Sequence, residues 1–335
     1  MENEKEILLS VKDLWVEYTS DKRVIHAVNG VSFDVRKGES LGIVGESGCG
    51  KSTLIKAIMR LLPMPPSRIP GGEILYKGRD VVQMNERELR SIRGSEMSMI
   101  FQDPMTALNP TIKIGKQIME IIMAHQHISK AEAKKRAMDM LKMVGIDESR
   151  FNEYPHQFSG GMQQRVVIAI ALSCNPELLL ADEPTTALDV TIQAQVLDMI
   201  TALIKMKNTT LLLITHNLAV VAETCDYVAV LYGGEIVEYG SKREIFKNPC
   251  HPYTVGLFGA LPDINRIGGK LKPIAGIMPD PSELPSGCKF HTRCPYATEI
   301  CKDGPVPTVN LGGTHQCQCH HIDDVIAAQK KEANI

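Results

Sequence analysis

The sequence has no apolar run that approaches the roughly 18 residues needed to span a membrane as a helix. Its longest apolar stretches, 166–172 and 211–214, suit buried core elements instead. The formal net charge over 335 residues is only -2, so the chain as a whole does not attract nucleic acid. The N-terminus is charged and lacks the apolar segment of a secretory signal. We therefore expect a soluble, cytoplasmic protein, which partner subunits would have to hold at any membrane.

Cysteine pairs at the tight C-x2–4-C spacing are also missing, although the chain holds nine cysteines. Cys49, Cys174, Cys225 and Cys250 are scattered, and reducing cytosol predicts that they remain free thiols. The other five lie within 288–319 and need a separate explanation. The remaining composition, 44% hydrophobic and 23% charged, is that of an ordinary globular protein with one large domain and an appendage, or with two domains.

The most informative motif in the sequence is one glycine-rich stretch. Residues 45–52 read Gly-Glu-Ser-Gly-Cys-Gly-Lys-Ser, which fits the G-x-x-x-x-G-K-S pattern of a phosphate-binding loop. An apolar strand, 40–44, precedes the loop and an apolar helical pattern, 51–62, follows it, as the motif requires. The loop amides would surround a phosphate, Lys51 would reach the β- and γ-phosphates, and Ser52 would ligate Mg²⁺. The sequence therefore predicts that the chain binds a nucleoside triphosphate.

Two later strands end in polar residues. Residues 178–182 form a buried-type strand that ends in Asp182 and continues into Glu183. In phosphate-loop NTPases such an aspartate holds the Mg²⁺ shell, and a following glutamate can orient and deprotonate an attacking water. The apolar strand 209–215 leads to His216, which could contact a γ-phosphate. A solvated strand end and a structural histidine are the simpler alternatives.

The segments before and just after the phosphate loop predict a β layer. Residues 7–18 and 24–35 are rich in Val, Ile, Leu and aromatics, which favours antiparallel strands, and 63–70 is typical of a proline-rich connector. Tyr18 could stack on adenine, although the residue alone favours a structural tyrosine. Gln102 follows another short apolar strand and could bring its amide oxygen to a metal or a water, or simply be exposed.

Helical periodicity covers 113–144 and predicts two amphipathic helices, which would form a subdomain beside the main sheet. Ser129 is a candidate N-cap of the second helix, with Glu132 as its capping-box partner. Further along, a Gly-Gly pair between two apolar runs predicts a β-hairpin over 227–239.

A Ser-Gly-Gly run opens a further helix. Residues 158–165 read Phe-Ser-Gly-Gly-Met-Gln-Gln-Arg and lead into an apolar helical segment. Ser159 can cap that helix, while Gly160 and Gly161 would expose its first N–H groups. This arrangement is a second anion-binding helix end, with an ordinary capped helix as the alternative.

Taken in order, these motifs resemble the ATP-binding subunit of an ABC transporter. In that resemblance the Walker A loop is 45–52, the signature is 158–162 and Walker B is 178–182. The signature departs from the commonest Leu-Ser-Gly-Gly-Gln form at both ends but keeps its Ser-Gly-Gly core. The resemblance covers about 7–253 and implies an α/β P-loop NTPase fold with an antiparallel β subdomain and a helical subdomain at about 112–175.

The resemblance also implies roles for single residues. Gln102 becomes the Q-loop glutamine, 187–189 the D-loop, His216 the switch histidine and Tyr18 the adenine-stacking aromatic. Each ATP is expected to lie between the Walker A loop of one subunit and the signature of another. The implied catalytic residues are Glu183, His216 and Lys51. The implied nucleotide-binding residues are Tyr18, Gly45, Glu46, Ser47, Gly48, Cys49, Gly50, Lys51, Ser52, Thr53, Gln102, Ser159, Gly160 and Gly161. The implied Mg²⁺ ligands are Ser52, Gln102 and Asp182.

The tail after residue 253 is rich in proline and holds the clustered cysteines. Disulfides are disfavoured in cytosol, zinc usually takes tight cysteine pairs, and an iron–sulfur cluster takes four thiolates at looser spacing. On the residues alone a cluster, zinc and unligated thiols stay open. The pattern Gly287-Cys288-x-Phe290-x-x-Arg293-Cys294-Pro295, then Cys301, then His315-x3-Cys319-His320, is similar to the C-terminal extension of peptide-importer ATPases, some of which carry a [4Fe–4S] cluster. We expect that extension to be the segment 254–335. That similarity implies the ligands Cys288, Cys294, Cys301 and Cys319, with Cys317 as a spare.

Three stretches, 101–110, 158–162 and 248–254, resemble the importer ATPases for dipeptides and oligopeptides. This resemblance implies a related second ATPase subunit, two transmembrane permease subunits, an external peptide-binding protein, no nucleic acid, and a place on the cytoplasmic side of the membrane. An importer of nickel or another small solute stays open, because ATPase motifs do not distinguish solutes. A DNA-repair or translation ABC ATPase would need a coiled-coil insertion, a second cassette or a basic surface, and the sequence has none of these.

Overall fold

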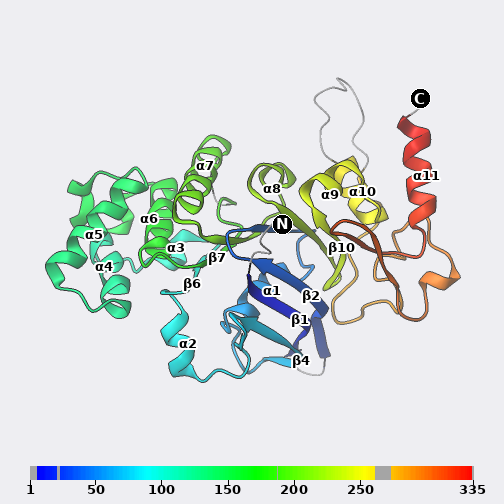
Figure 1. Cartoon of the computed structure of the whole chain (residues 1–335), viewed down its shortest axis with the longest axis horizontal. Helices are drawn as coiled ribbons and strands as arrows, with labels where there is room; N and C mark the ends of the chain where they lie inside the picture. The colour runs from blue at the N-terminus through cyan, green and yellow to red at the C-terminus, as the bar shows by residue number, and fades with distance from the viewer. Residues whose placement is uncertain (1–5, 21–22, 187, 261–272, 334–335) are drawn as a thin grey trace.

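The structure, a computed structural model, describes residues 6–20, 23–186, 188–260 and 273–333. Its strands form two sheets, and helices flank them (Figure 1). The helical segment 114–172 lies at one end of the long axis and the C-terminal helix at the other. The charged residues 1–5, on which part of the expectation about the N-terminus rests, lie outside the described residues.

The smaller sheet is antiparallel and consists of β1 (Ile7–Ser20), β2 (Arg23–Arg36), β4 (Ser67–Tyr76) and β5 (Arg79–Asp80), in the spatial order β2-β1-β4-β5. The prediction of an antiparallel layer before the phosphate loop is confirmed. Strand β4 starts inside the predicted connector 63–70, so that interpretation is wrong for 67–70. Pro70 is tolerated there because β5 pairs with β4 only from Leu75 onward, which leaves the edge beside the proline open.

The larger sheet has, in spatial order, β11 (Thr308–Gly312), β12 (His315–Gln318), β10 (Glu235–Ser241), β9 (Tyr227–Tyr232), β3 (Ser40–Val44), β8 (Thr210–Ile214), β7 (Leu178–Asp182) and β6 (Met97–Ile100). The strands from β9 to β6 are parallel, and the others pair antiparallel. Every residue of β7 and β8 is buried, as expected for apolar strands that are covered on both faces. The predicted strands and the predicted hairpin over 227–239 are confirmed.

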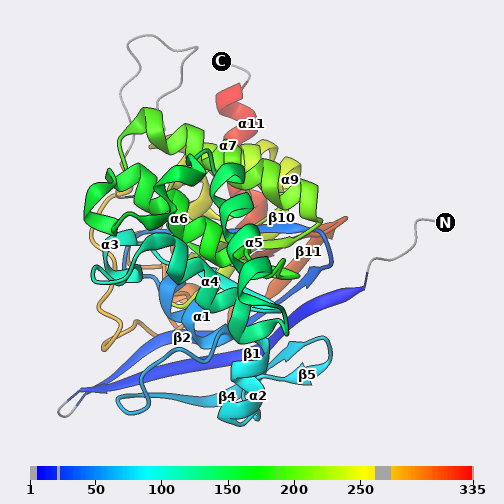
Figure 2. The same cartoon turned by 90° about the vertical axis from the view of Figure 1, so that its left-hand side faces the viewer.

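The α-helices are α1 (Lys51–Ile58), α2 (Glu86–Ile92), α3 (Pro104–Ala107), α4 (Ile114–His125), α5 (Lys130–Met143), α6 (Gly160–Leu172), α7 (Val190–Lys207), α8 (Leu218–Thr224), α9 (Lys242–Lys247), α10 (Pro252–Gly259) and α11 (Ile322–Ala333). Short 3-10 turns cover Glu148–Asn152, Pro155–Gln157 and Glu299–Cys301. In Figure 2 the helices α4 to α7 lie together above the antiparallel sheet. Among the described residues, we find no helix that is both long and apolar enough to cross a bilayer.

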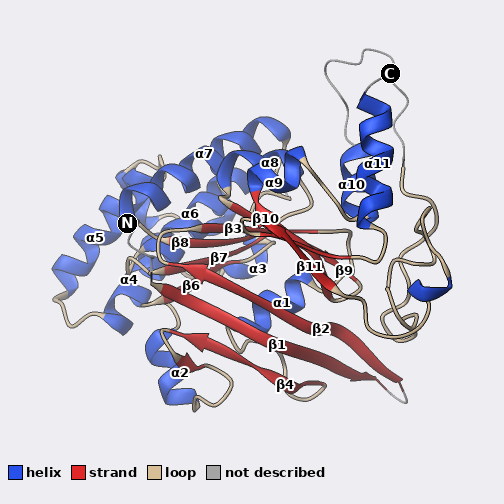
Figure 3. Cartoon of the chain, turned by 45° about the vertical axis from the view of Figure 1, so that its right-hand side comes forward, coloured by secondary structure: helices blue, strands red, loops and turns tan. Residues whose placement is uncertain are grey.

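Two apolar cores lie on opposite faces of the larger sheet. Helix α1 lies between the two sheets (Figure 3). Its Leu54 belongs to the first core together with side chains of both sheets. The second core forms under the helices on the other face. Successive residues of β8 alternate between them, so that Leu212 and Ile214 face the first core while Leu211 and Leu213 face the second. This alternation fixes the register of the strand that lies between β3 and β7.

The predicted N-cap of α5 is confirmed, because the Ser129 side chain accepts a hydrogen bond from the N–H of Glu132. The capping-box role predicted for Glu132 is wrong. Its carboxylate instead accepts a hydrogen bond of 2.9 Å from Nε of Arg136, one turn further along the same helix. An exposed i,i+4 ion pair therefore replaces the return bond to the cap residue.

The C-terminal segment joins the larger sheet through strand pairing. Strand β12 pairs with β10, with Cys317 opposite Glu238. The Glu238 carboxylate is buried and accepts hydrogen bonds from the N–H groups of Cys250, at 2.6 Å, and His251, at 3.0 Å. Nε2 of His315, on β12, lies 2.8 Å from the same carboxylate. One buried acid thus connects β10, the start of α10 and the C-terminal hairpin.

We expect Glu238→Ala to lower the free energy of unfolding by about 3 kcal/mol, because it leaves two backbone N–H groups and a buried histidine without their acceptor. Chemical denaturation followed by circular dichroism measures the change. Glu283→Ala is the matched control, since Glu283 only meets Arg23 at 3.9 Å on the exposed surface. That control should change stability by less than about 0.5 kcal/mol. Equal small losses in both variants would contradict a structural role for Glu238.

Candidate nucleotide site

The phosphate loop connects the end of β3 to the start of α1. Gly50 immediately precedes α1 and has a φ of 105°, in the left-handed region. A Cβ at this position would lie 2.1 Å from the carbonyl oxygen of Ala27, so only glycine fits. Because glycine has no side chain to cap the helix, the first N–H groups of α1 are left to bind an anion.

Lys51 lies inside the loop that it follows. Its side chain is buried, and Nζ donates to the carbonyl oxygens of Gly45, at 2.8 Å, and Glu46, at 2.9 Å. It can reach a phosphate oxygen by exchanging one of these short bonds. Burial raises the pKa of the neighbouring Cys49 thiol, which is therefore a neutral packing group of the loop.

A cavity of about 250 Å³ opens over the loop. Its lining comprises Tyr18, Ile25, Ala27, Ser47, Gly48, Gly50, Lys51, Ser52, Thr53 and Pro281. The hydroxyl of Tyr18 lies 3.3 Å from Oγ1 of Thr53, so the predicted adenine-stacking residue and the loop share one cavity. Pro281 comes from the C-terminal segment and was not predicted, because it carries no local nucleotide-binding signature.

Ser52 and Asp182 bring the two Walker motifs together. The Ser52 hydroxyl donates a hydrogen bond of 2.9 Å to Oδ1 of Asp182. Burial raises the pKa of the Asp182 carboxyl, and the bond from Ser52 opposes that effect. A hydroxyl and a carboxylate beside the phosphate loop fit Mg²⁺, which takes few protein oxygens and keeps water and phosphate ligands. A cation bound there would favour the carboxylate form.

Three strand ends converge on Glu183. Its Oε2 accepts hydrogen bonds from Oγ1 of Thr186, at 2.9 Å, and from Nε2 of Gln102, at 3.3 Å. Nδ1 of His216 lies 3.4 Å from the same oxygen. Glu183 has a positive φ of 46°, which is held by a bond of 2.9 Å from its N–H to the carbonyl oxygen of Ile214. The predicted Q-loop, catalytic and switch residues therefore meet, with Gln102 next to Glu183.

The signature residues lie outside this cavity. Ser159 precedes α6 with its side chain exposed and without a capping hydrogen bond. Gly160 has open space where a Cβ would be, whereas a Cβ at Gly161 would lie 2.6 Å from Cγ2 of Ile192 on α7. Among the described residues, the three are absent from the lining of the phosphate-loop cavity. Within one chain the signature and the phosphate loop are therefore two separate surfaces.

Only part of the predicted D-loop falls within the described residues. Asp189 caps α7 by accepting a hydrogen bond of 3.0 Å from the N–H of Ile192. Ala187 lies outside the described residues.

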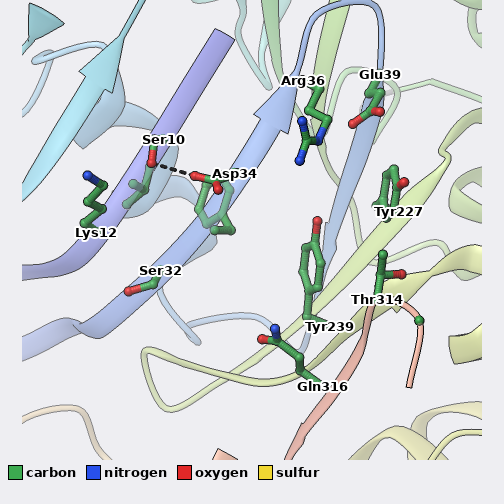
Figure 4. A pocket seen from close by; sticks show the side chains of 13 residues that line it. Ser10, Lys12, Ser32, Asp34, Arg36, Glu39, Tyr227, Tyr239, Thr314 and Gln316 are labelled. Atoms are coloured by element: carbon green, nitrogen blue, oxygen red, sulfur yellow. Dashed lines mark hydrogen bonds between the residues drawn. The ribbon is translucent and has the colours of Figure 1, made fainter. Parts of the chain in front are cut away.

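A larger hollow, of about 500 Å³, lies between the antiparallel sheet and the C-terminal hairpin (Figure 4). The hydroxyl of Ser10 donates a hydrogen bond of 2.5 Å to Asp34 at one side of it. Tyr227 and Tyr239 stack on the other side, with their ring centroids 6.2 Å apart. Its lining contains none of the described residues that the sequence predicted for nucleotide binding. This hollow is therefore separate from the nucleotide site.

The clustered cysteines of the tail come together in space. Burial, together with the neighbouring Cys288, Cys319 and Cys301, raises the pKa of the Cys294 thiol to about 12. The N–H of Cys288 also donates to the carbonyl oxygen of Cys301 at 2.9 Å. Cys317 is buried beside Cys250 and Cys319. The four cysteines that the resemblance selects are thus mutual neighbours.

A second group of possible metal ligands lies nearby. Glu238, Cys250 and His315 offer ligand atoms that all lie within 4.8 Å of one another. Among the described residues, this is the one trio of buried ligands that is so close. A tetrahedral zinc site would place its sulfurs about 3.8 Å apart, as Zn–S bonds of about 2.3 Å require. The four tail cysteines do not have that tight spacing.

Comparison with known proteins identifies the family. The family model described as "ABC transporter" matches residues 28–186, and that described as "Oligopeptide/dipeptide transporter, C-terminal region" matches 237–301. The chain is 51% identical to the oligopeptide transport ATP-binding protein OppD of Bacillus subtilis, over 92% of this chain and 87% of that relative. It belongs to the ABC transporter ATP-binding proteins of the oligopeptide and dipeptide type. This ABC subunit is an ATPase, and the family inferred from its motifs is confirmed.

Further comparisons agree on the fold and the branch. This ABC ATPase is 49% identical to the dipeptide transport ATP-binding protein DppD of Bacillus subtilis, over 98% of this chain and 97% of that protein. A solved ATP-binding cassette, described as a dimer in a post-hydrolysis state with ADP and Pi, matches with a TM-score of 0.64 at 29% identity. That match covers 70% of this chain and 99% of the solved one. The predicted P-loop NTPase fold is therefore confirmed.

We expect Glu183→Gln to keep ATP binding and to slow hydrolysis by about 100-fold or more, because glutamine cannot take a proton from water. Phosphate release measures turnover, and equilibrium binding of ATP measures affinity in the same preparation. Glu223→Gln, which changes an exposed carboxylate on α8, is the control and should hydrolyse ATP normally. Unchanged turnover of Glu183→Gln would remove Glu183 from the reaction.

Proposed function

We propose that this ABC ATPase drives the import of dipeptides or oligopeptides. The observation that carries the proposal is the likeness along the whole chain to ATP-binding proteins named for peptide transport, including 97% of the length of DppD. The match at 237–301 to the oligopeptide/dipeptide C-terminal region adds to it, since that region lies largely outside the ATPase motifs. An importer of nickel or another small solute from the same branch is the alternative, whereas the matched C-terminal region favours peptides.

In this proposal each ATP lies between the Walker A loop of one subunit and the Ser-Gly-Gly signature of a second ATPase subunit. The exposed signature at Ser159, separate from the phosphate-loop cavity, supports an intermolecular site. The dimeric description of a solved relative supports it as well. The second subunit is proposed to be related but different, so that the working pair is a heterodimer.

The proposed complex also contains two transmembrane permease subunits and an external or periplasmic peptide-binding protein, but no nucleic acid. Permeases would supply the membrane-crossing helices, which the described part of this chain does not contain. The ATPase would then lie on the cytoplasmic side of the membrane. Peptide selectivity would reside in the binding protein and the permeases, because the motifs of the ATPase predict nucleotide binding and do not distinguish solutes.

The proposed reaction is hydrolysis of the bond between the β- and γ-phosphates. Glu183 takes a proton from water as the water oxygen bonds to the γ-phosphorus, and the bridging oxygen leaves with ADP. Gln102, beside Glu183, orients that water, and His216 contacts the γ-phosphate. Lys51 and the loop amides balance the phosphate charge. Ser52, Gln102 and Asp182 would hold Mg²⁺, and the ion would supply further positive charge to the phosphates; of these residues, Ser52 and Asp182 are already hydrogen-bonded to each other.

The tail cysteines are proposed to hold a [4Fe–4S] cluster with a structural role. Cys288, Cys294, Cys301 and Cys319 would be its ligands, and Cys317 would be spare. The proposal is supported by the proximity of these thiols, because the pKa of Cys294 is raised in part by Cys288, Cys301 and Cys319. Thiols whose pKa is raised by burial would be stabilised as thiolates once they bind iron.

A transport assay tests the peptide proposal. We expect cells that lack this chain to lose ATP-dependent uptake of labelled dipeptides or oligopeptides, and the wild-type chain to restore it, because the permeases need its hydrolysis to cycle. Complementation with Glu183→Gln should not restore uptake. Restored uptake of nickel without any effect on peptides would favour the alternative solute.

Metal analysis of protein purified without oxygen tests the cluster. We expect about four iron atoms per chain with matching sulfide and a brown colour, since four thiolates hold such a cluster. Cys294→Ser should lose iron and colour, whereas Cys317→Ser, the matched control, should retain them. Colourless protein that carries zinc in place of iron would overturn the cluster.

A further inference from the structure

The C-terminal segment contacts the phosphate loop directly. Nη1 of Arg293 donates to one carboxylate oxygen of Glu46 at 2.6 Å, and Nη2 donates to the other at 3.1 Å. The arginine side chain is only 4% exposed and that of Glu46 is 31% exposed. This paired fork is the strong geometry of an arginine–carboxylate bond. It joins residues that lie 247 positions apart in the sequence.

Arg293 is held in one orientation by its surroundings. Nε donates to the carbonyl oxygen of Ala275 at 2.9 Å. The guanidinium carbon lies 5.8 Å from the ring centre of Tyr232 and 5.9 Å from that of Phe290. Cation–π contacts of this kind favour the charged, fixed side chain. The fork is therefore preorganised before Glu46 binds to it.

The backbone of Glu46 is held from the same side. Its N–H donates to the hydroxyl of Tyr253 at 2.8 Å, and the ring of Tyr253 packs edge-on against Tyr232 with centroids 4.6 Å apart. The carbonyl oxygen of Glu46 accepts from Nζ of Lys51 at 2.9 Å. One loop residue thus has its carboxylate, its N–H and its carbonyl all bound, and the first two are bound by residues beyond the Walker motifs.

The charge of Glu46 makes this contact matter for ATP. An unpaired carboxylate in the loop would repel the triphosphate and could compete for Lys51. We infer that Arg293 is a positioning residue of the ATP site, which neutralises the Glu46 carboxylate and holds it away from the phosphates. The C-terminal segment is then a working part of the nucleotide site as well as an appendage of the sheet.

A second contact of the same segment supports this inference independently. The carbonyl oxygen of Pro281 accepts a hydrogen bond of 3.0 Å from the N–H of His26, and Pro281 lines the phosphate-loop cavity together with Tyr18. The segment therefore reaches the cavity at Pro281 and reaches the phosphate loop at Arg293. The inference rests on the ATP site of this family and does not depend on which solute is transported.

Equilibrium titration of the full chain with a fluorescent ATP analogue and Mg²⁺ tests the inference. We expect Arg293→Ala to weaken binding about tenfold, because it frees a carboxylate beside the phosphates. Glu46→Gln should bind more tightly than the wild type, since it removes the repelling charge while the backbone amides of the loop, which are the groups that would bind phosphate, are unchanged. The double variant should return to within about twofold of the wild type. Arg293→Lys keeps the charge but not the fork, and should lie in between.

Glu283→Gln is the matched control, because it breaks only the exposed pair that Glu283 makes with Arg23 and should leave affinity unchanged. Thermal unfolding of each variant separates a loss of binding from a loss of folding. If Arg293→Ala does not fold, Glu46→Gln still tests the inference, because it leaves the C-terminal segment unchanged. Wild-type affinity in Arg293→Ala would overturn the inference. It would also fail if the double variant bound as weakly as Arg293→Ala, or if Glu46→Gln alone weakened binding.

Discussion

The common carboxyl edge of the parallel strands is the constraint on which the rest of this structure depends. The register of β3, β8 and β7 places Ile43 and Asp182 on either side of Ile214, so the loops that follow begin at one level. That level carries the phosphate loop, the Glu183 carboxylate and His216. A polar group after any one strand would be an ordinary loop residue. At this edge Glu183 and His216 lie together with the phosphate loop, which leads into the N-terminus of α1. That arrangement suits phosphoryl chemistry.

Local patterns were sufficient for most of the fold and for the centre of the site. Short apolar runs that end in polar groups located the strands, and the glycine pattern located the loop. Predictions from local sequence were wrong where a residue that is a neighbour in the fold determined the local structure. Pro70 lies in a strand because the edge of the sheet beside it is open. Glu132 pairs with Arg136 and does not hydrogen-bond back to the N-cap residue. Tyr253 and Arg293 act on Glu46 across more than 200 positions, and no spacing rule connects residues so far apart.

The connection between the C-terminal segment and the ATPase core rests on buried charge. Glu238 is fully enclosed, so each of its bonds to Cys250, His251 and His315 replaces water that it has lost. Such a group favours one arrangement strongly, because any displacement of β12 removes His315 from the buried carboxylate. The same reasoning applies to Arg293, whose enclosed guanidinium would be costly to leave unpaired. Charge therefore fixes how the segment docks, while the apolar cores supply most of the stability.

The arginine–glutamate fork has a consequence for protein engineering. A cassette truncated after residue 260 would keep every Walker and signature residue, yet the Glu46 carboxylate in the phosphate loop would lose its arginine partner. A chimera that grafts the tail of one relative onto the core of another would have to transplant the arginine and its acid together. Residue pairs of this kind mark which modules can be exchanged freely and which must travel as a unit.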